Sequence, residues 1–185
     1  MRLTPLAVVL LLVGCPARRD DGLRPMPRAP LRDGGAPDLS DDALVQRLGV
    51  DRATLRRVVT YAPMDCVLVH ARRDGRWGAW AVDARAATTG MAGATRVLRA
   101  WAAMGYAPFT EELARVVGLF AAPDATVIPR RDVVEVDGAP VWAAAPSAAP
   151  DGRGGRVLSF SLRGPDGALR TASFAISSDH AVTAR

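Results

Sequence analysis

The stretch CVLVHARRDGRWGAWAVDA, residues 66–84, is the part of the sequence that decides the fold. Two runs rich in Val, Leu and Trp, residues 66–73 and 76–84, flank the dipeptide Asp74-Gly75. Asp-Gly between two apolar runs is a strong signal for a two-residue hairpin, because both central residues of that turn need a positive φ. We therefore predict an antiparallel strand pair here.

The sequence beyond residue 125 returns to strand patterns. Further strands are predicted over residues 126–128, 133–136, 141–144, 158–162 and 168–176. Asp137-Gly138 marks a second hairpin, and Gly164-Pro165-Asp166-Gly167 marks the turn before the last strand. The Pro- and Gly-rich residues 146–155 are predicted to form a loop.

Helical patterns lie between the two groups of strands and before the first. Apolar residues recur at helical spacing over residues 94–101 and 113–120, and Thr110 is a candidate N-cap for the second of these helices. Upstream, Ser40 and Gly49 suit the two ends of a short helix. A second short helix is predicted from a cap at Asp51 to Pro63.

Helices that bracket antiparallel hairpins favour an α+β fold. We expect short N-terminal helices, a central pair of amphipathic helices and antiparallel β-hairpins in a single domain, residues 40–185. The chain shows no internal repeat, and its 185 residues suit one domain with a tether.

The first fifteen residues, MRLTPLAVVLLLVGC, have the layout of a secretory signal. Arg2 gives a positive start, residues 6–13 are apolar, and Gly14 puts a small residue before Cys15. The apolar run is shorter than the roughly 20 residues that span a bilayer. Leu12-Val13-Gly14-Cys15 resembles the lipobox of bacterial lipoproteins, which implies that residues 1–14 are a signal peptide and that Cys15 carries a diacyl or triacyl anchor.

Residues 15–39 are predicted to be the lipidated cysteine and a Pro-rich tether. Prolines recur there without an apolar period, which is typical of an extended linker. The lipobox resemblance implies a lipid-anchored protein of the cell envelope with the membrane as partner. Pro16 stands where many Gram-negative lipoproteins have the Asp of inner-membrane retention, so the outer membrane, facing the periplasm, is favoured.

The charge of the chain does not name a partner. All 24 basic residues are Arg, and the net charge of +5 is modest for this length. Arg without Lys, together with abundant Ala, Gly and Pro, is typical of a GC-rich genome. Of the two cysteines, Cys66 has no intramolecular partner if Cys15 is acylated, and we expect it to be buried.

One alternative is a DNA-binding protein whose start is misassigned. Residues 44–57, LVQRLGVDRATLRR, resemble a bacterial helix-turn-helix, and the following hairpin stands where a winged-helix protein has its wing. The Pro-rich tether, however, replaces the helix expected before this motif. A DNA-binding module also has no role outside the cytosol, so the favoured interpretation includes no nucleic acid.

A second alternative is an envelope hydrolase with an unrecognised site. Cys66 and His70 are about 13 Å apart along a strand, too far to touch, so a thiol-imidazole site would need His180 instead of His70. Residues 177–180, SSDH, hold the residue types of a hydrolytic triad but are adjacent in sequence. The sequence therefore predicts no catalytic residue, no metal site and no cofactor.

The favoured function is a binding or scaffolding module for an envelope protein of unknown identity. Trp77 and Trp80 are three residues apart, so their side chains are expected on opposite faces of the strand. One should enter the core and the other could contact a partner. The possible interaction surface comprises Trp77, Trp80, Arg72, Arg73 and Arg76.

Overall fold

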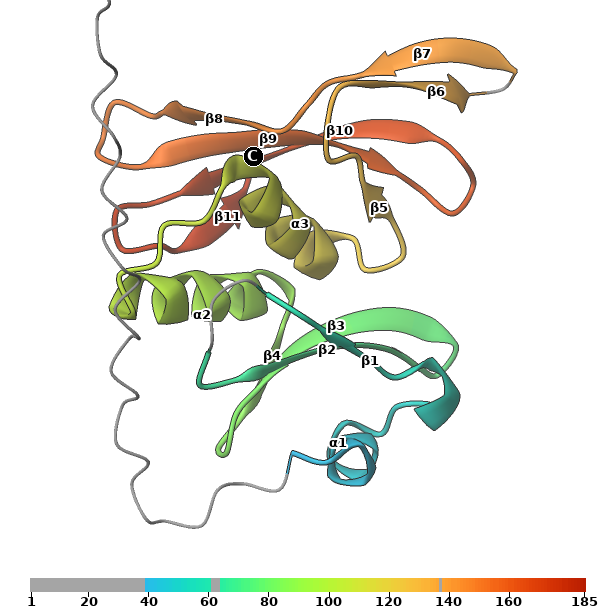
Figure 1. Cartoon of the computed structure of the whole chain (residues 1–185), viewed down its shortest axis with the longest axis vertical. Coiled ribbons are helices and arrows are strands. Elements are labelled where there is room, and N and C mark those ends of the chain that lie inside the picture. The colour runs from blue at the N-terminus through green and yellow to red at the C-terminus, as the bar shows by residue number, and fades with distance from the viewer. Residues whose placement is uncertain (1–38, 61–63, 137) are drawn as a thin grey trace, which may run out of the picture. The chain divides into compact units, whose positions relative to one another are not determined.

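The computed structural model describes residues 39–60, 64–136 and 138–185, shown in Figure 1. These residues belong to one compact unit. The predicted signal peptide, Cys15 and nearly all of the tether lie outside the described residues. Their assignment therefore stays a prediction.

The first sheet is antiparallel and contains the hairpin that the sequence predicts. Its order is β1 (Arg56–Val58), β2 (Val67–Arg73), β3 (Arg76–Val82) and β4 (Ala87–Thr89). Arg73 pairs with Arg76 across the turn, where Asp74 and Gly75 have φ values of 52° and 76°. The two-residue turn is confirmed.

The segment before this sheet differs from the prediction. Helix α1 (Asp41–Leu48) begins at the N-cap Ser40, and Gly49 ends it with φ 62°. The second helix expected from Asp51 is wrong: the chain forms one 3-10 turn, η1 (Arg52–Thr54), and then β1. Hydrogen bonds to the edge of β2 explain the difference, because Asp51 N–H donates to the Arg72 carbonyl and Arg72 N–H donates to Thr54 Oγ1. Residues 51–57 thus contain no recognition helix.

Two helices follow, α2 (Gly90–Ala103) and α3 (Thr110–Ala121). The apolar residues of the predicted helical pattern are buried in both. Thr110 is not the cap that the sequence suggests, because Phe109 occupies the N-cap position and no side chain caps the helix there. No helix in the described part of the chain is long and apolar enough to cross a membrane.

The second sheet is built around β9. It comprises β5 (Thr126–Val127), β8 (Ser147–Pro150), β9 (Arg156–Arg163), β10 (Leu169–Ile176) and β11 (Val182–Ala184). β10 pairs along one edge of β9, while β8 and β5 share the other edge. The loop predicted over residues 146–155 is wrong at its start, because Ser147 to Pro150 pair with β9 as strand β8. A separate hairpin is made by β6 (Asp132–Val136) and β7 (Ala139–Ala143), as predicted.

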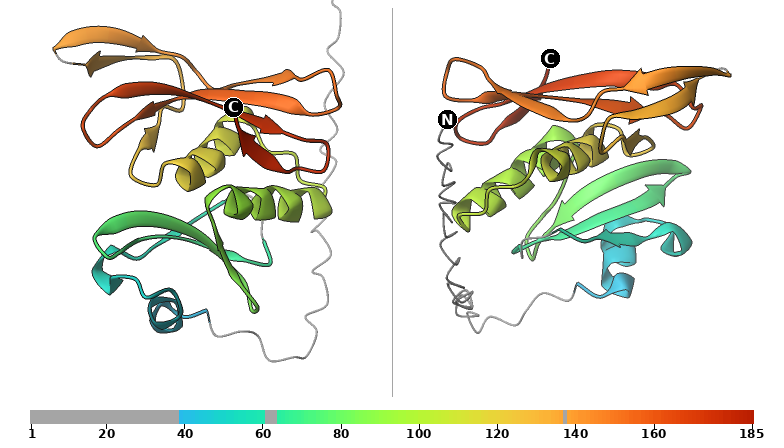
Figure 2. Two further views of the ribbon diagram at one scale, coloured as in Figure 1. Left: turned by 180° about the vertical axis from the view of Figure 1, so that it is seen from behind. Right: turned by 45° about the horizontal axis from the view of Figure 1, so that its top comes forward.

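The layers place α2 and α3 between the two sheets, and α1 covers the far side of the first sheet (Figures 1 and 2). The largest core lies around the two helices and takes residues from both sheets, including Leu68, Trp101, Val117 and Phe160. Leu44, Val69 and Trp80 belong to a smaller core under α1. The fold is α+β, as the sequence predicts, with more residues in strands than in helices.

Candidate interaction surfaces

The two tryptophans of β3 face opposite sides of the first sheet, as predicted. Trp80 is only 6% exposed and packs in the core under α1. Gly78 makes room for it, because a Cβ at this glycine would lie 2.3 Å from Cη2 of the Trp80 ring. The Arg73 guanidinium covers the ring at 5.8 Å from its centroid. Trp80 therefore is not available to a partner.

Trp77 is half-buried at the rim of the opposite face. Its ring stacks on His70 with centroids 4.4 Å apart, and the Arg72 guanidinium lies 5.0 Å from its centroid. The His70 Nε2 donates to the carbonyl oxygen of Pro123 at 2.7 Å. The stack leaves Arg72 exposed, and Arg76 is exposed at the hairpin turn. Of the predicted surface, Arg72, Arg73 and Arg76 are exposed and Trp77 is partly exposed.

Cys66 is buried, and its thiol is poorly reactive. Burial raises the pKa of its thiol to about 11, and the nearby Asp65 carboxylate acts in the same direction. A thiol with that pKa is protonated at neutral pH and is a weak nucleophile. His70 is directed to the Pro123 carbonyl on the connection between α3 and β5. These two residues show no geometry of a nucleophile and base.

The SSDH segment, residues 177–180, forms the turn between β10 and β11. Ser177 Oγ donates to Asp179 and accepts from Ala181 N–H. Arg99 of α2 binds Asp179 at 2.6 Å. The Ser177 hydroxyl and Arg99 hold the pKa of Asp179 below its usual range. These contacts fasten the turn to α2, so the residues have a structural role here.

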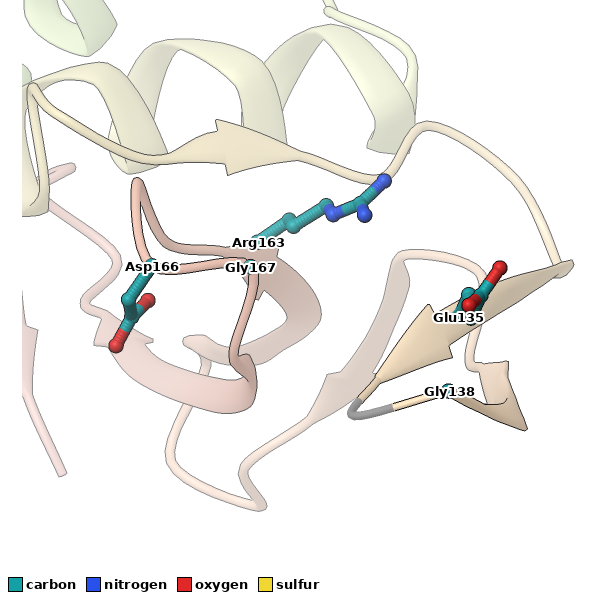
Figure 3. A pocket seen from close by; sticks show the side chains of 5 residues that line it. All are labelled: Glu135, Gly138, Arg163, Asp166 and Gly167. Carbon is teal, nitrogen blue, oxygen red and sulfur yellow. The ribbon is translucent and has the colours of Figure 1, made fainter.

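Two of the hollows on the described surface have charged side chains in their lining. One of about 480 Å³ lies over α2, where Arg96 contacts Asp65 at 3.0 Å and Asp83 at 2.6 Å. The other, of about 370 Å³, is lined by Glu135, Gly138, Arg163, Asp166 and Gly167. In Figure 3 the Asp166 side chain points away from Arg163, and Glu135 stands apart on the hairpin. Among the described residues, no group of three or more His, Cys, Asp or Glu side chains is placed to hold a metal ion.

The β6–β7 hairpin carries the most exposed tryptophan among the described residues. It projects beyond the second sheet in Figure 1. Trp142 is 64% exposed and pairs across the hairpin with Val133, which is 43% exposed. The Arg131 guanidinium lies 4.8 Å from the Trp142 ring centroid. We call the side of the hairpin that carries Arg131, Val133 and Trp142 the outward face.

Comparisons of the chain with protein-family models, with curated proteins and with solved structures find no match.

The inner face of the same hairpin holds it on the body of the protein. Val134 and Ala143 pack with Ile128, and Val136 and Leu169 lie against this cluster. Sequence reasoning missed Trp142, because both faces of the hairpin carry Val and alternation alone does not say which face meets the core. The signal that was present is the pairing of Trp142 with Val133, which puts the two large side chains on one side.

Proposed function

We propose that the chain is a membrane-anchored envelope lipoprotein whose folded domain is a binding module. The outward face of the β6–β7 hairpin is its binding surface. Support for the anchor comes from the leader, in which a charge, an apolar run, a small residue and Cys15 follow in the order of a lipobox. Two or more acyl chains hold a protein firmly on a membrane surface.

One observation carries the binding proposal: Trp142 is 64% exposed next to a partly exposed Val133. A Trp side chain buries roughly 150–250 Å² when covered, and each Å² of apolar area removed from water contributes about 25 cal/mol. Trp and Arg are also among the residues most enriched in the positions that dominate binding energies. The stacked Arg131 and Trp142 therefore present a preformed anchor for a partner.

The test of the anchor is mass spectrometry of the N-terminus of the native chain. We expect acyl groups on Cys15 in the wild type and in the control Cys66→Ala, which lacks only the buried cysteine. Cys15→Ala should carry none and should leave the membrane fraction. An unmodified Cys15 still joined to Gly14 would end the lipoprotein proposal.

The test of the binding surface is co-purification from solubilised envelope with the full chain as bait. Trp142→Ala should lose the partner that the wild type retains. Trp77→Ala is the matched control, since its ring is half-buried in the His70 stack on a different sheet. Equal recovery with both variants would contradict the assignment of this face.

A further inference from the structure

We infer that the outward face of the β6–β7 hairpin binds the same face of a second copy of this chain. The inference rests on the proposed function only in taking this face as the binding surface. It names the partner that the proposed function leaves open, and it does not require the lipid anchor.

The charged residues of the outward face are arranged so that two copies of this face complement each other. Residues of a strand alternate between its faces, so Glu135 lies on the same side as Val133, nearer the turn of the hairpin. Arg131, at the other end, is placed on this side by its contact with the Trp142 ring. In chain order the face therefore carries a basic residue, the apolar pair Val133 and Trp142, and an acidic residue, with the Arg131 guanidinium reaching over the Trp142 ring.

A two-fold axis converts this arrangement into a closed interface. In such an interface each residue i meets residue j while j meets i. An axis through Val133 places Arg131 of one copy opposite Glu135 of the other, twice. The two Trp142 rings and the two Val133 side chains then fill the centre. A bilayer surface suits the face less well, because its two charges have opposite signs and anionic lipids attract basic clusters.

The edges of the hairpin are less suited to the other obvious mode of association, in which a strand is added to the sheet. Pro140 lacks an N–H group in β7. In β6, the Val133 N–H already donates to Asp132 Oδ1 at 2.9 Å. Blocked edge groups of this kind protect a sheet from pairing with a further strand. Association through the side chains of the outward face is therefore favoured over pairing at either edge.

The size of the contact predicts a weak dimer. Two short strands offer fewer than the roughly 20–30 residues a side of a standard interface. The experiment is therefore done with the full chain in the cells that make it rather than in dilute solution.

A cysteine at the axis should meet its own copy. We expect the full chain with Val133→Cys to give a covalent homodimer when a short bis-maleimide joins two thiols. Thr171→Cys is the matched control, since Thr171 is exposed on β10 and is not part of the outward face. The wild-type chain controls for Cys66 and for any unacylated Cys15.

Charge reversal then tests the register of the two copies. In the Val133→Cys chain, Arg131→Glu or Glu135→Arg alone should lower the dimer yield about tenfold, because like charges then face each other. The double exchange should restore the yield, and circular dichroism should show all variants folded.

Three results would overturn the inference: equal cross-linking in Thr171→Cys, no effect of the single charge reversals, or capture of another protein by Val133→Cys. If the last occurs and Trp142→Ala also loses that protein, the proposed binding surface stands while the homodimer fails. If the homodimer forms but Cys15 carries no acyl group, the anchor fails while this inference stands.

Discussion

Gly78→Ala is predicted to destabilise the protein through a single clash. The new Cβ would lie 2.3 Å from Cη2 and 2.7 Å from Cζ2 of the Trp80 ring, and the ring is packed in the core under α1. Forcing an extra carbon into a well-packed site costs about 1–3 kcal/mol. We therefore expect the free energy of unfolding to fall by about 2 kcal/mol.

Whether Gly78→Ala destabilises or stabilises the protein should depend on the presence of the Trp80 ring. Trp80→Ala alone should cost about 3–5 kcal/mol, the usual range for removing a large buried aromatic side chain. In that background the clash is gone, and Ala in place of Gly lowers the entropy of the unfolded chain by about 0.4–1 kcal/mol. Gly78→Ala should then be neutral or stabilising, with a coupling energy of about 2 kcal/mol between the two sites.

The assay is urea unfolding of the four chains of this double-mutant cycle, with the slope m checked for constancy. Trp77→Ala replaces Trp80→Ala in a control cycle, because Trp77 lies on the opposite face of the same strand. If Gly78→Ala costs the same in all backgrounds, the position of the Trp80 ring over Gly78 is refuted. If Trp77→Ala restores stability instead, the two faces of β3 have been exchanged.

Two further predictions follow from the described contacts. In a Cys15→Ala chain, Cys66 should react with iodoacetamide at pH 8 at least about a hundredfold more slowly than a free thiol, because its pKa of about 11 leaves little thiolate. The rate should rise with pH up to that value, and a rate equal to that of unfolded protein would contradict the burial. Asp83→Asn should cost about 1–2 kcal/mol near pH 7, since the Asp83 carboxylate accepts from the N–H groups of Ala86 and Arg85 and pairs with Arg96. These hydrogen bonds lower the pKa of Asp83, so the carboxylate stabilises the folded state above its unfolded pKa, and the difference from wild type in urea unfolding should disappear as the pH falls through its folded pKa.

The sequence predicted those elements whose local signals agree with their tertiary setting. The hairpin at Asp74-Gly75 needs only its turn residues and the two apolar runs, so its position and register were predictable. The amphipathic faces of α2 and α3 were readable for the same reason. The class of the fold followed from the order of these elements.

The missed elements are those that a neighbouring strand imposes. Ser147 to Pro150 have little strand propensity, yet they pair with β9 because its edge offers unpaired backbone groups. Asp51 to Val58 suit a capped helix equally well by pattern, but hydrogen bonds to the edge of β2 make them a turn and a strand. The local sequence of these two segments does not show which strand edge each of them will pair with.

The candidate site was less predictable than the fold. Alternation correctly separated Trp77 from Trp80, and left open which of them enters the core. Trp142 was harder to find, because its exposure follows from which side of the β6–β7 hairpin packs on Ile128 and Leu169. Which side of the hairpin is buried therefore depends on how the hairpin packs against the second sheet.

Because α2 and α3 lie between the two sheets, their core cannot close until the C-terminal strands have been synthesised. Val117 and Phe120 share one core with Phe160 and Phe174, which are synthesised later. A chain that stops after α3 would therefore expose the apolar surface that β9 and β10 cover. Only the arrival of the C-terminal strands closes the core, so a truncated product would present bare apolar surface to chaperones and proteases and be sorted from the finished protein.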